Sequence, residues 1–63
     1  MYTIRFYPRG SGSAPAYIIS ARNFGEIMRE LDSRFPGATN IHFDCRANGV
    51  RVEFDLPAEA AAA

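Results

Sequence analysis

The stretch IHFDCRANGVRVEFDL, residues 41–56, decides the fold, because apolar and polar residues alternate on both sides of its Asn48-Gly49 pair. Such alternation is typical of strands with one buried face and one open face, and Asn-Gly supplies the two positive-φ positions of a tight hairpin turn. A turn centred on this pair sets Ala47 opposite Val50. The stretch therefore predicts an antiparallel hairpin with one apolar face and one polar face.

This register places like charges opposite one another on the polar face of the hairpin. Arg46 faces Arg51, and Asp44 faces Glu53. Like charges in directly opposed positions are mildly destabilising in a sheet. The face is then either an ordinary solvated strand surface, where charges cost little, or a surface for a partner. In the second case we expect the acidic residues Asp44, Glu53 and Asp55 to engage an arginine-rich partner surface.

Two further strands precede the hairpin. Residues 2–7 alternate between apolar and polar side chains, which predicts a half-buried strand. Residues 8–15 are rich in Gly, Ser and Pro and predict a flexible loop. Residues 16–21 predict the second strand. Because Tyr17, Ile18 and Ile19 are all apolar, the pattern leaves open which of them lies on the outer face.

A helix is predicted between the two pairs of strands. Asn23 can cap its N-terminus, and Glu26 three residues later completes a capping box. The helix is expected to run to about Phe35, because the Pro-Gly pair that follows stops it. Apolar residues at helical spacing form one stripe that should bury against the sheet. The stripe consists of Phe24, Ile27, Met28, Leu31 and Phe35.

The element order predicts an α+β fold, a ββαββ two-layer sandwich with one helix packed on a four-stranded, mostly antiparallel sheet. Residues 1–57 are expected to form a single domain, and residues 58–63 an Ala-rich C-terminal tail. The order and lengths of the elements resemble the β-grasp architecture of ubiquitin-like and immunoglobulin-binding bacterial domains. That resemblance implies that the first and last strands lie parallel at the centre of the sheet, and a plain antiparallel order is the alternative.

The composition argues against several classes of function. The chain has 63 residues, too few to enclose a large ligand cavity. Its formal net charge is zero, with seven acidic residues against seven arginines, so it lacks the general attraction of sequence-independent nucleic-acid binders. The sequence contains no apolar run long enough to span a membrane. We therefore expect a cytoplasmic protein that does not contact membranes.

Neither catalysis nor metal binding is expected. His42 and Cys45 are separated by an odd number of strand positions and point to opposite faces, so they cannot form a nucleophilic pair. Cys45, on the apolar face, should be buried. His42 shares the polar face with Asp44, Glu53 and Asp55, but a flat open face gives metal ligands no supporting contacts. We therefore expect no enzymatic activity, no cofactor and no metal.

The first pair of strands also offers a surface for binding. Arg5 and Tyr7 project from its outer face together with either Tyr17 or Ile18, and Arg9 follows in the loop. Tyr and Arg are the residue types most enriched at protein interface hot spots. RNA-binding sheets also stack bases on exposed aromatic rings, but the acidic hairpin would repel phosphates. Protein binding is therefore favoured over nucleic-acid binding, with the candidate residues Arg5, Tyr7, Arg9, Tyr17, Arg22, Asp44, Glu53 and Asp55.

A short domain of this kind, with arginine as its only base and no catalytic groups, is similar to accessory proteins of phages and mobile elements, including small anti-CRISPR inhibitors. The similarity lies in size, architecture and charge display. It implies a non-enzymatic inhibitor in the host bacterial cytoplasm that covers the nucleic-acid-binding surface of a host CRISPR-Cas surveillance complex. The alternatives are a small RNA- or DNA-binding protein and a phage assembly subunit, and the chain could be a monomer or a homodimer.

Overall fold

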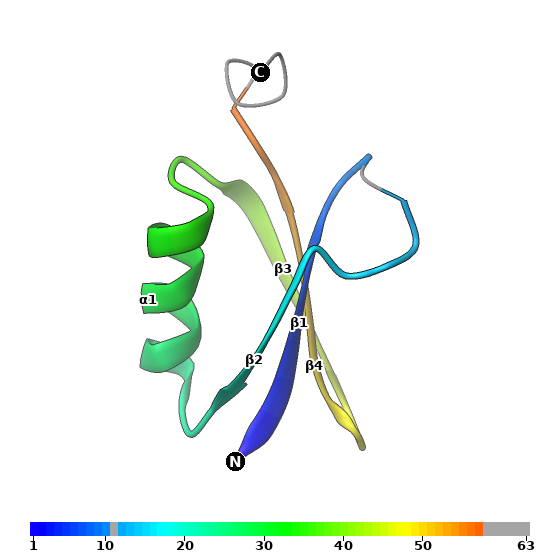
Figure 1. The fold of residues 1–63 in the computed structure, drawn as a ribbon, viewed down its shortest axis with the longest axis vertical. Helices are drawn as coiled ribbons and strands as arrows, with labels where there is room; N and C mark the ends of the chain where they lie inside the picture. Colours follow the sequence, from blue (N-terminus) through cyan, green and yellow to red (C-terminus); the bar gives the residue numbers. More distant parts are fainter. Residues whose placement is uncertain (11, 58–63) are drawn as a thin grey trace.

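The computed structural model, which describes residues 1–10 and 12–57, has one helix lying along one face of a four-stranded sheet (Figure 1). The predicted α+β fold with ββαββ order is confirmed. The predicted tail, residues 58–63, lies outside the described residues. The elements are β1 (Tyr2–Pro8), β2 (Tyr17–Ala21), α1 (Phe24–Arg34), β3 (Thr39–Arg46) and β4 (Gly49–Asp55).

The strand order in the sheet is β2-β1-β4-β3, so the first and last strands of the chain lie together at the centre. β1 and β4 are parallel, whereas the β1–β2 and β3–β4 pairs are antiparallel. The sheet is therefore mixed. This is the arrangement that the β-grasp resemblance implies, and the plain antiparallel order is wrong.

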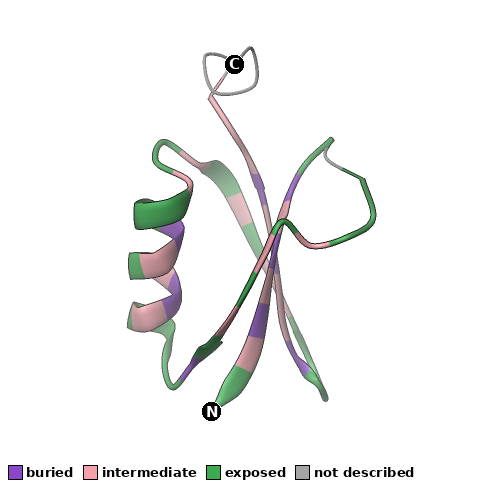
Figure 2. Ribbon diagram, viewed as in Figure 1, coloured by how far each residue is buried: buried purple, intermediate pink, exposed green. Residues whose placement is uncertain are grey.

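The core lies between the sheet and α1, where alternate strand residues meet the apolar side of the helix (Figure 2). Phe6 and Phe54 come from the two central strands, and their ring centroids are 6.4 Å apart. Phe35, just after the helix, packs against Phe54 at 4.9 Å. Burial of these large side chains is the main source of stability in so small a domain. The buried residues are Ile4, Phe6, Ala21, Ile27, Leu31, Val52 and Phe54.

The predicted cap of α1 is present. The side chain of Asn23 accepts a hydrogen bond from the backbone N–H of Glu26 at 3.0 Å. Glu26 Oε1 in turn accepts one at 2.7 Å from the N–H of Arg22, one residue earlier than in the usual capping box. This backbone donor and the Arg22 guanidinium hold the pKa of Glu26 below its ordinary value.

One member of the predicted apolar stripe lies outside the core. Ile27 and Leu31 are buried, but Phe24 in the first turn of α1 is 54% exposed. Its ring packs on Phe43 of the edge strand β3, with a centroid distance of 4.4 Å. Because β3 lies at the edge of the sheet, Phe24 packs at the border of the fold and remains largely exposed.

The hairpin register differs by two residues from the prediction. Arg46 faces Gly49, because Ala47 and Asn48 form the turn and neither has a positive φ. Gly49 has a φ of +136°, and a Cβ on it would overlap the carbonyl oxygen of Thr3 in β1. Glycine is therefore required here for the close contact between the two central strands. Gly49 is the first residue of β4 and is not part of the two-residue turn.

The corrected register changes the charge pairing on the hairpin. Asp44 lies opposite Arg51, so the predicted opposition of like charges is wrong. A second irregularity occurs in β3, where the pairing shifts between Thr39 and His42 and Asn40 adopts a φ of +51°. Cys45 faces Val50 but is exposed, because it lies near the open end of the edge strand, so its predicted burial is also wrong.

Replacing Gly49 with Ala should destabilise the fold strongly. The substitution combines backbone strain at positive φ with a clash against the Thr3 carbonyl, and we expect a loss of about 2–4 kcal/mol in the free energy of unfolding. Gly10→Ala is the matched control, since Gly10 has a φ of +88° but no atom within 4 Å of the added Cβ. Urea denaturation should show a loss of only about 1 kcal/mol for this control, and equal losses would contradict the prediction.

Candidate functional site

The candidate site is the face of the sheet opposite α1, which we call the outer face. No described helix or strand lies over it (Figure 1). Its residues alternate with those of the core and follow from the observed strand pairing. The outer face consists of Thr3, Arg5, Tyr7, Ile18, Ser20, His42, Asp44, Arg46, Arg51 and Glu53.

A row of side chains crosses the middle of the outer face. Arg5 of β1 is paired with Ile18 of β2 on one side and with Arg51 of β4 on the other. Arg51 is in turn opposite Asp44 of β3. The parallel register of β1 and β4 therefore sets two arginines side by side at the centre of the sheet, next to an isoleucine that is 53% exposed.

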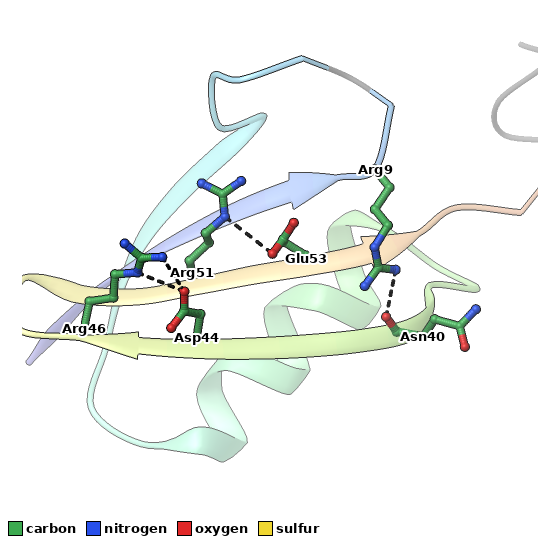
Figure 3. A network of polar contacts seen from close by, with 6 residues as sticks. All are labelled: Arg9, Asn40, Asp44, Arg46, Arg51 and Glu53. Carbon is green, nitrogen blue, oxygen red and sulfur yellow. Dashed lines mark hydrogen bonds and ion pairs between the residues drawn. The ribbon is translucent and has the colours of Figure 1, made fainter.

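Arg51 lies against Tyr7 and Glu53 on the outer face, and Figure 3 shows the contact with Glu53. Its guanidinium carbon is 3.8 Å from the centroid of the Tyr7 ring, which is a cation–π stack. Its Nε is 3.6 Å from Glu53 Oε1. Arg46 donates from Nε and Nη2 to Asp44 Oδ2, at 2.9 and 2.6 Å. Each carboxylate of the outer face thus already has an arginine beside it.

Arg5 differs from these two arginines. It is half-buried, and its guanidinium has no hydrogen bond or ion pair with any residue that the structure describes. It lines an open pocket of about 310 Å³. Arg46 and Arg51 line the same pocket, together with Tyr7 and Asn48. Three arginines therefore converge on one hollow of the outer face.

Asp55 belongs to a separate network at one end of the sheet. Arg9 Nη1 donates to Asp55 Oδ1 at 3.0 Å and to the backbone oxygen of Asn40 at 2.9 Å. The Asn40 side chain donates to Asp55 Oδ2 at 2.8 Å. The hydrogen bond from Asn40 and, to a lesser extent, the one from Arg9 hold the pKa of Asp55 below its ordinary value of 3.8. The network ties the end of β1 to β3 and β4, and it occupies both carboxylate oxygens.

Two predicted site residues lie away from the outer face. Tyr17 is on the helix side of the sheet, where its ring centroid is 6.1 Å from that of Phe6. The guanidinium carbon of Arg34 lies over the same ring, 4.6 Å from its centroid. Arg22 lies before α1 and pairs with Glu26 at 3.3 Å. The alternative that the sequence left open is thereby decided, since Ile18 and not Tyr17 stands beside Arg5.

The structure thus brings together four of the eight predicted site residues, namely Arg5, Tyr7, Asp44 and Glu53. Arg9 and Asp55 form the network at the end of the sheet. Sequence reasoning omitted Arg46 and Arg51 from the site, although their alternation with the acidic residues was sufficient to place them on the same face. Asn40 had no local signal, because its role depends on the irregular pairing of β3.

Comparison with protein-family models, with curated proteins and with solved structures found no match. Within residues 1–10 and 12–57, no three His, Cys, Asp or Glu side chains are grouped so as to hold a metal ion. The described part of the chain also contains no helix that is long and apolar enough to cross a membrane.

Replacing Asp55 with Asn should remove a pH-dependent part of the stability. Because the pKa of Asp55 is lowered in the folded state, its contribution is present above the pKa of the unfolded state and is lost as the pH falls through the folded value. In urea denaturation, Asp55→Asn should be less stable than the wild type at pH 7, and the difference should shrink on acidification.

The matched control is Asp32→Asn, on the exposed side of α1, where the carboxylate has no hydrogen bond or ion pair with a described residue. Asp55→Asn should have the lower urea midpoint of the two variants at pH 7. Equal midpoints at that pH would show that the Arg9 network does not stabilise the fold.

Proposed function

We propose that this chain is a non-enzymatic protein-binding module that docks a partner on its outer face. The observation behind the proposal is the group at the centre of that face, where Arg5 is half-buried and has no partner among the described residues. It lies between an exposed Ile18 and an Arg51 stacked on Tyr7. Arg and Tyr dominate the binding energy of protein interfaces, because they bury a large area at low entropic cost. The open sheet supplies a flat, rigid platform for them.

Nucleic-acid binding is the second candidate, and the arrangement favours it less. Stacking on a sheet requires free aromatic faces. Tyr7 is the one Phe, Tyr or Trp residue among the described residues of the outer face, and Arg51 already stacks on its ring. Tyr17 lies on the other side of the sheet. Asp44 and Glu53 on the same face would repel a phosphate backbone, and the net charge of zero gives no compensating attraction.

The predictions of a CRISPR-Cas inhibitor and of an assembly subunit are narrower proposals about the identity of the partner. An inhibitor of a CRISPR-Cas complex that imitates nucleic acid would need carboxylates free to meet the arginines of its target. Asp44, Glu53 and Asp55 each lie beside an arginine of this chain, so this arrangement does not support the acidic-mimic version. A cytoplasmic inhibitor or an assembly subunit that binds through its arginine and tyrosine side chains agrees better with the outer face.

Affinity capture with matched tyrosine variants tests the proposal. The tagged protein is incubated with nuclease-treated lysate of cells that naturally contain it, and bound proteins are identified by mass spectrometry. Tyr7→Ala should reduce capture of the partner by about tenfold, as expected for a hot-spot residue. Tyr2→Ala, which removes a 60% exposed tyrosine from the helix side of β1, should leave capture unchanged.

Two outcomes would contradict the proposal. Loss of every bound protein after nuclease treatment would favour the nucleic-acid alternative. Loss of capture with Tyr2→Ala but not with Tyr7→Ala would place the docking surface on the helix side of the sheet. Circular dichroism of both variants confirms that the fold is intact before capture is compared.

A further inference from the structure

We propose that the pocket between Arg5, Arg46 and Arg51 receives the carboxylate of an Asp or Glu side chain of the protein partner. This inference rests on the proposed function, because it names the chemistry by which the outer face would recognise that partner. The pocket is open, has a volume of about 310 Å³ and is lined by all three arginines. Gly49 also lines it.

The charges around the pocket do not balance among the residues that the structure describes. Asp44 is occupied by Arg46, with both hydrogen bonds to its Oδ2 (Figure 3). Glu53 lies 3.6 Å from Arg51, which is a loose ion pair. Arg5 has no acidic partner among the described residues. Three guanidinium groups therefore share two carboxylates, and one positive charge is left uncompensated.

The strand register makes Arg5 the place where an added anion would have most effect. Arg5 lies directly beside Arg51 in the parallel pair β1–β4, and like charges in such positions repel. Arg5 is also half-buried, so water screens its charge less than that of a fully exposed arginine. A carboxylate between the two guanidinium groups would relieve the repulsion and accept several charge-assisted hydrogen bonds.

The charge balance around the pocket favours a partner's carboxylate over a nucleic-acid phosphate. One carboxylate compensates for the one uncompensated charge. A nucleic-acid strand brings a phosphate with every nucleotide, so its neighbouring phosphates would meet Asp44 and Glu53 within the same face. The planar guanidinium of Arg can form two parallel hydrogen bonds with the two oxygens of a carboxylate. The contact is therefore specific in geometry as well as favourable in charge.

The test is a titration followed by NMR of the arginine Nε–H signals in ¹⁵N-labelled protein. The probe is the blocked peptide acetyl-Gly-Glu-Glu-Gly-amide, and the same peptide with Gln in place of Glu is its neutral control. We expect the Nε–H signals of Arg5 and Arg51 to shift with the Glu peptide. The Gln peptide should leave them in place.

Two arginine variants make the test specific. Arg5→Gln should weaken binding of the Glu peptide by about three- to tenfold, because it removes the arginine that has no hydrogen bond or ion pair with another described residue. Arg29→Gln removes the same charge from the exposed surface of α1, where the side chain also lacks a hydrogen bond or ion pair with described residues. This control should change the affinity by less than about twofold.

Several results would overturn the inference. Signals of Arg29 that shift as much as those of Arg5 would show unspecific attraction, and unchanged affinity in Arg5→Gln would exclude the pocket. Tighter binding of inorganic phosphate or of a short oligo(dT) strand would assign the pocket to phosphate. Any of these results, together with a captured partner that depends on Tyr7, would leave the proposed function standing. Loss of all partners after nuclease treatment would overturn both.

Discussion

The close approach of β4 to β1 at Gly49 is the constraint on which the rest of the structure depends. Without a side chain at Gly49, the start of β4 can lie against the Thr3 carbonyl of β1. The parallel register then pairs Phe6 with Val52 on the core side. It also sets Arg5 beside Arg51 on the outer face. One backbone contact thus aligns the buried core and the surface charges together.

Much of the fold could be predicted because its signals are local. Alternation identified the strands, and Asn23 with Glu26 identified the start of the helix. The register of the second hairpin could not be predicted in this way. Asn48-Gly49 is a strong turn signal on its own, but Gly49 is required against Thr3, so the turn moves back to Ala47 and Asn48. A contact between distant strands overrides the local preference.

The candidate site was predictable only in part, for the same reason. The strand pattern placed Arg5 and Tyr7 on one face, but three consecutive apolar residues in β2 left the facing direction of Tyr17 undecided. The structure resolves this through packing, since the Tyr17 ring fills space between Phe6 and Arg34. The hydrogen bonds of Asp55 depend on the positive φ of Asn40 within β3. The alternation of apolar and polar residues in the sequence does not reveal such a backbone irregularity.

The corrected register also changes what the outer face can recognise. Opposed like charges would have presented a block of acidic side chains to a basic partner. The observed pairing instead places each acidic residue beside an arginine, so the acidic residues neutralise charge within the face. In the proposed mode of binding, recognition depends on Arg5, which has no hydrogen bond or ion pair with another described residue and lies between an exposed Ile18 and the Tyr7–Arg51 stack. A cation framed by apolar and aromatic surface matches an acidic residue set in an apolar patch of a partner.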